Sequence, residues 1–159
     1  MSIVLDGTSG LTTNSGTLIS ASTIGVGGAT PSTSGAGITF PATQSASSDA
    51  QTLDDYEEGN WTPTCSNGST YTGNYIKIGK IVHLYYESTS SGTITAANTN
   101  LTGLPFSSGG SSGSSGCGTY VNFGSTAAFG GTQVQNSTLY FVTASGSINL
   151  RGHHCFYVG

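Results

Sequence analysis

The chain has 159 residues and a mass of 16.0 kDa, which suits one compact domain or one small domain joined to an extended segment. Charged residues make up 6% of the sequence, against about 25% in an average soluble chain. Three Lys and Arg residues and a net charge of −4 argue against a phosphate-backbone partner, so we expect no nucleic-acid binding. No apolar run approaches the ~20 residues of a membrane span, and no secretory pattern follows Met1, so we expect no membrane insertion.

The composition favours an all-β fold over disorder. Disordered chains are typically rich in Glu, Lys and Pro, whereas this chain has 25 Gly, 8 Tyr, 6 Phe and 4 Pro. Short runs in which Gly, Ser, Thr, Tyr and Val alternate suit strands and tight turns. Because few surface charges support solubility, we expect copies of the chain or a larger assembly to cover much of its surface.

The first part of the chain, residues 1–53, is low in complexity and contains a single aromatic residue, Phe40. Its aliphatic residues come in small groups between Gly-containing turns. Each group buries too little apolar area to offset the entropy of ordering its neighbours. The segment is therefore either a flexible linker or an extended arm or short shaft packed against partners, and its spaced β-branched pairs favour the arm.

An acidic stretch at residues 54–63 contains four of the seven acids and the only Trp. The composition changes here, so we predict an arm with an acidic junction over residues 1–58 and a head domain over residues 59–159. We interpret the acids as a solvated junction, with a helical turn capped by Thr52 or Asp54 as one form. Glycosidic cleavage needs two carboxylates held several ångströms apart on rigid elements, so adjacent acids predict no enzyme and no catalytic residues.

The predicted head domain begins with a hairpin. Residues 74–78 and 81–87 flank a turn at Gly79. Both faces of the second strand are largely apolar, which predicts a central strand between two layers. A Gly/Ser-rich segment, residues 107–118, is expected to be an exposed loop. Further short strands are expected at residues 93–95, 119–123, 137–143, 147–150 and 154–158. This spacing predicts a β-sandwich of jelly-roll type.

Four runs of the sequence resemble one family. They are Gly-Ile-Thr-Phe-Pro-Ala-Thr-Gln at 37–44, Thr-Leu-Asp-Asp-Tyr-Glu-Glu-Gly-Asn-Trp-Thr-Pro at 52–63, Gly-Asn-Tyr-Ile-Lys-Ile-Gly-Lys-Ile-Val at 73–82 and Leu-Thr-Gly-Leu-Pro-Phe at 101–106. Together they are similar to tailed-bacteriophage virion proteins, often labelled tail fibre or structural protein. The Leu-Asp-Asp-Tyr-Glu-Glu-Gly block is the most specific of these motifs.

The resemblance implies a homotrimer in the virion, made in the host cytoplasm and joined to other virion proteins. It implies a tail fibre or receptor-binding knob that binds a host surface glycan or protein. A capsid decoration protein, acting as cement or head fibre, is the alternative, and a polysaccharide-degrading tailspike is a third interpretation. Because about 55 residues precede the block, at about 3.3 Å per extended residue, we expect a short arm rather than a long shaft.

The densest group of potential metal ligands is His153-His154-Cys155. On a strand, His153 and Cys155 point to one face and His154 to the other. Two ligands are too few for zinc, which takes four, although three copies around an axis could supply six. The alternative makes His153 a turn residue and Cys155 a small buried hydrophobe. We therefore predict no metal and no other cofactor, with His153 and Cys155 as the only candidate ligands.

The three cysteines, Cys65, Cys117 and Cys155, show no C-x-x-C spacing. Free thiols are expected in a reducing cytoplasm, with a Cys65–Cys117 or a Cys117–Cys155 bridge as alternatives. His83 falls within an apolar strand and is interpreted as a hydrogen-bonded structural histidine.

The eight tyrosines could include a carbohydrate-binding platform, although most are expected in the core or a trimer interface. Tyr71 and Tyr120 lie beside Gly-rich segments. We therefore expect these two to be exposed and take them as candidate receptor-binding residues.

Overall fold

A computed structural model of the chain describes residues 23–44, 46–89, 92–95, 100–109, 115–122, 128–142 and 145–159. These residues form strands and turns without any helix, so the all-β prediction is confirmed. In particular, no helix among them is long and apolar enough to cross a membrane. The first 22 residues of the predicted arm lie outside the described residues.

The chain divides into two compact units, Met1–Ser45 and Ala46–Gly159. In the first unit, β1 (Thr23–Gly25) and β2 (Gly37–Thr39) form a parallel pair in which Ile24 lies opposite Ile38. Ile24 is 37% exposed and Ile38 is 58% exposed, as expected for apolar groups too small to form their own core.

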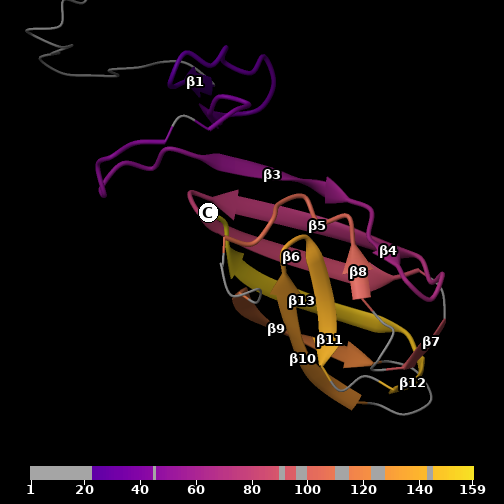
Figure 1. Cartoon of the computed structure of the whole chain (residues 1–159). Coiled ribbons are helices and arrows are strands. Elements are labelled where there is room, and N and C mark those ends of the chain that lie inside the picture. Colours follow the sequence, from indigo (N-terminus) through magenta and orange to yellow (C-terminus); the bar gives the residue numbers. More distant parts are fainter. Residues whose placement is uncertain are drawn as a thin grey trace, which may run out of the picture. The chain divides into compact units, whose positions relative to one another are not determined.

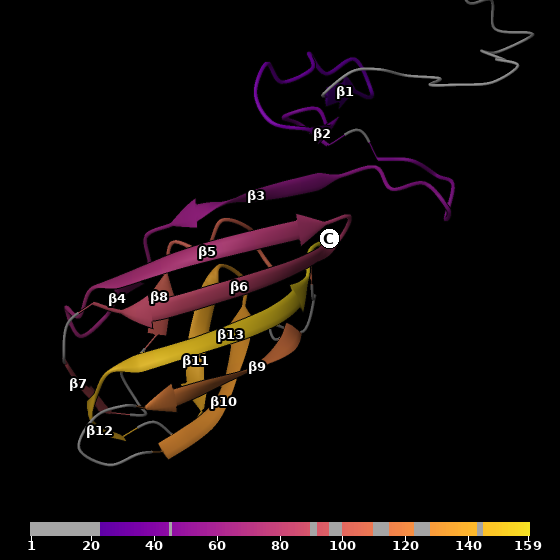
Figure 2. The ribbon, with the colours of Figure 1, turned by 180° about the vertical axis from the view of Figure 1, so that it is seen from behind.

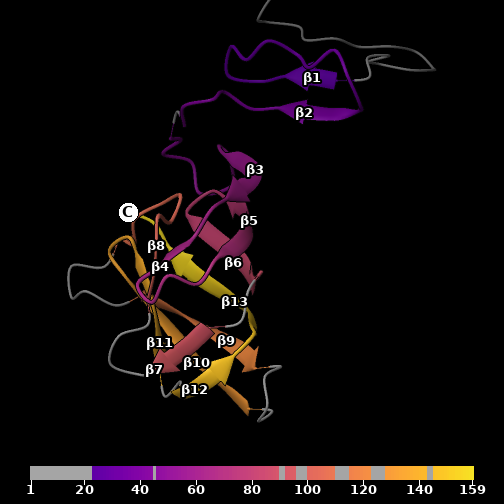
Figure 3. The ribbon, with the colours of Figure 1, turned by 90° about the vertical axis from the view of Figure 1, so that its right-hand side faces the viewer.

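The second unit is built on one nine-stranded sheet in which every strand pairing is antiparallel (Figure 1). Its strands are β3 (Tyr56–Trp61), β4 (Thr64–Cys65), β5 (Tyr71–Ile78), β6 (Ile81–Ser88), β8 (Asn100–Thr102), β9 (Ser115–Asn122), β10 (Ala128–Gln135), β11 (Thr138–Val142) and β13 (Leu150–Tyr157). A separate two-stranded ladder joins β7 (Gly92–Thr95) to β12 (Ser145–Ile148), as Figure 3 shows.

The sheet curls back on itself. Its strand order is β3-β5-β6-β13-β9-β10-β11-β8-β4, so the two end strands are neighbours in the chain, separated only by Thr62 and Pro63. A bridge between Thr64 and Thr70 brings β4 back to the start of β5. The order β13-β9-β10-β11 is a Greek key. In Figure 2, β3, β5, β6 and β13 run side by side, with β8, β10 and β11 crossing behind them, which gives a sandwich-like architecture.

The predicted hairpin is confirmed, because β5 pairs with β6 through a two-residue turn in which Gly79 has a φ of 54°. The prediction that both faces of β6 are covered is wrong within this chain. Val82, Leu84 and Tyr86 are buried, whereas Ile81 and Tyr85 are each 40% exposed. The predicted exposed loop at 107–118 also differs, because β9 already begins at Ser115.

The predicted domain boundary, residue 58, falls inside β3, and the whole acidic stretch belongs to the second unit. The helical turn considered for the acidic junction does not form, because Tyr56 to Glu58 pair with β5 as a strand. Residue 54 and its neighbours before β3 are not helical either.

The core lies between the two layers of the curled sheet. Its buried hydrophobic residues are Trp61, Cys65, Tyr71, Val82, Leu84, Tyr86, Leu101, Leu104, Tyr120, Val134, Leu139, Phe141, Leu150, Phe156 and Val158. Phe141 joins the two layers by edge-to-face contacts, with ring centroids 5.8 Å from Tyr86 and 5.4 Å from Tyr120.

Aromatic rings on the inner face lie over glycines of the neighbouring strand. The register partners are Trp61 with Gly73, Tyr75 with Gly59, Tyr86 with Gly152, and Tyr120 with Gly130. A Cβ at Gly130 would lie 2.6 Å from Cζ of Tyr120, and one at Gly152 would lie 2.5 Å from Cζ of Tyr86. Only glycine leaves room for the rings at these positions. The four pairs therefore determine how closely the rings approach the backbone of the neighbouring strand.

Adjacent glycines on β10 test this packing. Gly130→Ala should lower the free energy of unfolding by about 1–3 kcal/mol, because its methyl group overlaps the Tyr120 ring. Gly131→Ala is the matched control: its Cβ would meet nothing closer than the Gly118 oxygen at 4.0 Å, so its stability should match or slightly exceed the wild type. Equal losses for the two variants in denaturant titrations would contradict the packing described here.

Candidate functional site

The side chains of β3, β5, β6, β13 and β9 that point away from the core form a continuous surface, here called the outer face. One row across it is apolar and follows the strand register from β3 to β13. Its members and exposed fractions are Tyr56 39%, Ile78 47%, Ile81 40% and Tyr157 46%. Lys80 extends over the Tyr157 ring, 5.5 Å from its centroid.

Two further rows mix apolar and polar groups. The second contains Glu58, Ile76, His83, Cys155 and Cys117. The third contains Asn60, Asn74, Tyr85, His153 and Thr119. An exposed ion pair between Arg151 and Glu87, with Nη2 and Oε1 2.5 Å apart, lies beyond the third row.

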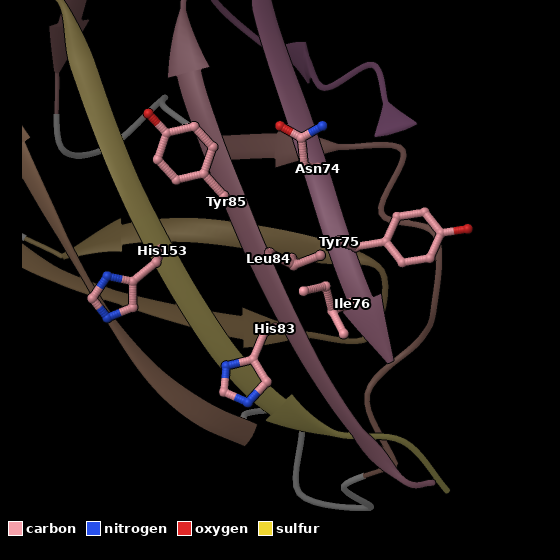
Figure 4. Close-up of a pocket in the computed structure, with 7 residues that line it drawn as sticks. All are labelled: Asn74, Tyr75, Ile76, His83, Leu84, Tyr85 and His153. Carbon is pink, nitrogen blue, oxygen red and sulfur yellow. The ribbon is translucent and has the colours of Figure 1, made fainter. Parts of the chain in front are cut away.

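A hollow of about 260 Å3 lies on the second and third rows (Figure 4). Its lining residues are Asn74, Tyr75, Ile76, His83, Leu84, Tyr85 and His153. A neighbouring hollow of about 390 Å3 shares Asn74, Tyr75 and Ile76 with it and adds Glu58, Gly59 and Asn60. Together they offer an aromatic ring, two imidazoles and two amides around an apolar centre, a set suited to non-covalent recognition.

The acidic block fixes β3 to β5. Asp55 forms a buried ion pair with Lys77, whose ammonium group also lies 5.6 Å from the centroid of Phe106. Burial lowers the pKa of Lys77, while the nearby charge of Asp54 acts in the opposite direction. Asp54 itself accepts a hydrogen bond of 2.8 Å from the backbone N–H of Ser47. Two acids of the predicted solvated junction therefore have structural partners.

The two glutamates of the block are held by tyrosines. Tyr56 donates to Glu58 at 2.8 Å, and Tyr75 donates to Glu57 at 2.5 Å. The second bond, with burial and the glutamate charge, raises the pKa of Tyr75 to about 12. Glu57 and Glu58 lie on opposite faces of β3. On the inner face the Tyr75–Glu57 bond links β5 to β3, and on the outer face the Tyr56–Glu58 bond joins two residues of β3.

The candidate metal ligands, His153 and Cys155, share the outer face, as the strand alternation predicts. His154 is fully buried on the inner face, where its Nδ1 lies 2.8 Å from the Thr132 hydroxyl. Among the described residues, no group of three or more His, Cys, Asp or Glu side chains is arranged to hold a metal ion. His83, interpreted from the sequence as a hydrogen-bonded structural histidine, is exposed on the outer face, where its Nε2 lies within hydrogen-bond distance of Cys155 Sγ, 3.8 Å away.

The expected exposure of Tyr71 and Tyr120 is also wrong. They are 3% and 4% exposed, because both occupy the inner phase of their strands and pack in the core. The exposed tyrosine of the hollow is Tyr85, although the apolar pattern of its strand predicts a covered face. The alternation of β6 identifies it once Leu84 and Tyr86 are assigned to the inner face.

Comparison of the chain with protein families, curated proteins and solved structures gave no match. The candidate site is therefore defined by its own geometry: an apolar, hydrogen-bonding face supported by a buried ion pair.

The Asp55–Lys77 pair should be essential to the stability of the β domain that carries the outer face. Asp55→Asn leaves a buried ammonium without its counter-charge and should lower the free energy of unfolding by about 3–5 kcal/mol. The double substitution Asp55→Leu with Lys77→Met should recover most of that loss, since it removes both charges. Glu87→Gln, which breaks the exposed Arg151 pair, should change little. Denaturant titrations would contradict the assignment if the single and double variants were equally unstable.

Proposed function

We propose that this chain is a structural protein of a bacteriophage particle, a tail fibre or receptor-binding knob whose β domain is a non-catalytic binding head. The observation that carries the proposal is the exposed outer face with its apolar row and hollow. Extended apolar surfaces on a soluble domain commonly mark sites of interaction. Tyrosine also combines apolar area with a hydrogen-bonding hydroxyl, which makes it frequent at interfaces.

The acidic block supports a structural role. Its carboxylates bond to Ser47, Lys77, Tyr56 and Tyr75, and the contacts with Lys77 and Tyr75 hold the acidic block and β3 against β5. In the phage proteins that the sequence resembles, this block joins an anchoring part to a β domain. This chain has the same order along its sequence: a small β1–β2 unit precedes the block, β3 begins within the block, and the remaining strands of the large sheet follow it.

The small number of charges supports binding through contact area and through several copies of the chain, rather than through long-range electrostatic attraction. With three Lys and Arg residues in the chain, electrostatic steering contributes little to encounter rates. Several copies on one particle, for example in a homotrimer, convert weak single contacts into high avidity. The proposed partners are other virion proteins for the first unit and a host surface glycan or protein for the outer face.

Two outer-face variants test where the head binds. Ile76→Ser and Tyr85→Ser should each reduce binding of particles or purified protein to host cells by roughly tenfold or more, the effect typical of interface anchors. Val142→Ser is the matched control, because it removes a 44% exposed side chain from β11. All three should keep the unfolding midpoint of the wild type. Normal host binding by both outer-face variants would exclude the outer face as the adhesion surface.

The position of the chain on the particle tests the function itself. Cryo-electron microscopy of the intact particle, with and without its tail, should place this density at the tail. Density at three-fold positions of the capsid would instead favour the capsid decoration role, and its loss should then lower the temperature at which the head bursts. Absence of the chain from purified particles would overturn the proposal.

A further inference from the structure

Two of the three cysteines meet on the outer face. Cys117 on β9 and Cys155 on β13 are direct register partners at the end of the β9–β13 ladder, and both belong to the outward phase of their strands. Cys117 is exposed and Cys155 is partly exposed, whereas Cys65 is buried in the core. The fold therefore brings together two thiols that are 38 positions apart in the sequence and keeps the third away from solvent.

The pairing has the dimensions of a cross-strand disulfide. Directly opposed residues in antiparallel strands have Cα atoms about 4.5 or 5.5 Å apart, depending on the hydrogen-bonding phase. Disulfides span Cα separations of about 4.4–6.8 Å, so either phase fits. Because both side chains leave the same face of the sheet, their Cβ vectors point to the same side, as a disulfide requires.

The surroundings distinguish the roles of the two thiols. Burial raises the pKa of Cys155, and the neighbouring Cys117 raises it further. Cys117 is the more accessible thiol and is therefore the one that a reagent from solution reaches first. Cys155 Sγ lies 3.8 Å from Nε2 of His83, which projects from β6 on the same face (Figure 4). An imidazole nitrogen without a proton can accept the thiol proton of Cys155.

We propose that Cys117 and Cys155 form a reversible redox pair that closes into a cross-strand disulfide by exchange with a small-molecule disulfide. The Cys117 thiolate attacks the reagent, forms a mixed disulfide and releases one small thiol. Cys155 then transfers its proton to His83 and attacks the Cys117 sulfur, which releases the second small thiol. The protein loses two electrons and two protons, and the reagent is reduced to two thiols.

The disulfide would connect β9 to β13 at the β9 side of the outer face, next to His83 of the hollow and within the Greek key. Cross-linking residues far apart in sequence restricts the unfolded chain, so the oxidised form should be the more stable one. This inference concerns the chain's own thiols and does not depend on the proposed function.

The test is treatment of the full chain with oxidised glutathione near neutral pH, followed by alkylation in denaturant, which also exposes Cys65, and peptide mass spectrometry. We expect a Cys117–Cys155 linked peptide lighter by two hydrogen atoms, with Cys65 as the only alkylated cysteine. The thermal unfolding midpoint should rise by several degrees and return after addition of dithiothreitol. Glutathione retained on Cys117 with Cys155 still alkylated, or a disulfide between two chains, would overturn the proposal.

Single substitutions separate the two steps. Cys155→Ser, a nearly isosteric change on the outer face, should stop the reaction at the mixed disulfide on Cys117. Cys65→Ala is the control and should still form the linked peptide. His83→Gln should slow closure several-fold near neutral pH but not at alkaline pH, where Cys155 ionises without help. An unchanged closure rate at both pH values would contradict the role of His83 as proton acceptor.

Discussion

The packing of aromatic rings against glycines on neighbouring strands is the constraint on which the β domain depends. Glycine normally weakens a strand. It loses more backbone conformational freedom on folding than other residues do, and it offers no side chain to pack. Here the missing Cβ atoms let Trp61, Tyr75, Tyr86 and Tyr120 lie close to the backbone of the next strand. Large rings thereby bury much area over small partners, which explains how a chain with 35% apolar residues closes a core.

This packing also determines what reaches the outer face. Since successive side chains alternate, assigning Tyr86 and Gly152 to the inner face places Tyr85 and His153 on the outer face. The same phase places Lys77 inside, where it requires Asp55 as a partner, and places Ile76 and Ile78 outside. The apolar row, the hollow and the thiol pair are therefore consequences of one register, and a shift by a single residue would remove all three.

The sequence predicted what depends on local pattern. Strand alternation and a Gly-Lys turn were sufficient for the β5–β6 hairpin, and alternation alone placed His153 and Cys155 on one face. It could not assign the phase of Tyr71 or Tyr120, because an aromatic residue beside glycines suits an exposed loop as well as a strand. Their burial depends on partners in other strands, such as Gly130 of β10 for Tyr120 of β9, and the local pattern does not define this register.

The acidic stretch shows the same limit. The sequence predicted a solvated junction here, because four acids fall close together. In the structure Asp55 is buried and forms an ion pair with Lys77, 22 residues away. The apolar character of both faces of β6 predicted a covered strand, whereas the structure leaves Ile81 and Tyr85 exposed. Such an apolar surface on a chain with few charges is the feature that the proposed adhesion role explains.

The most direct test of the glycine–aromatic packing is nuclear magnetic resonance of the α protons of the four glycines. Protons held against the face of an aromatic ring resonate upfield, so signals of Gly59, Gly73, Gly130 and Gly152 should be shifted upfield relative to Gly131. Tyr120→Leu should remove the shift at Gly130 alone. Signals for all four glycines at the position of Gly131 would contradict the account, because the rings could not then lie over their neighbouring strands.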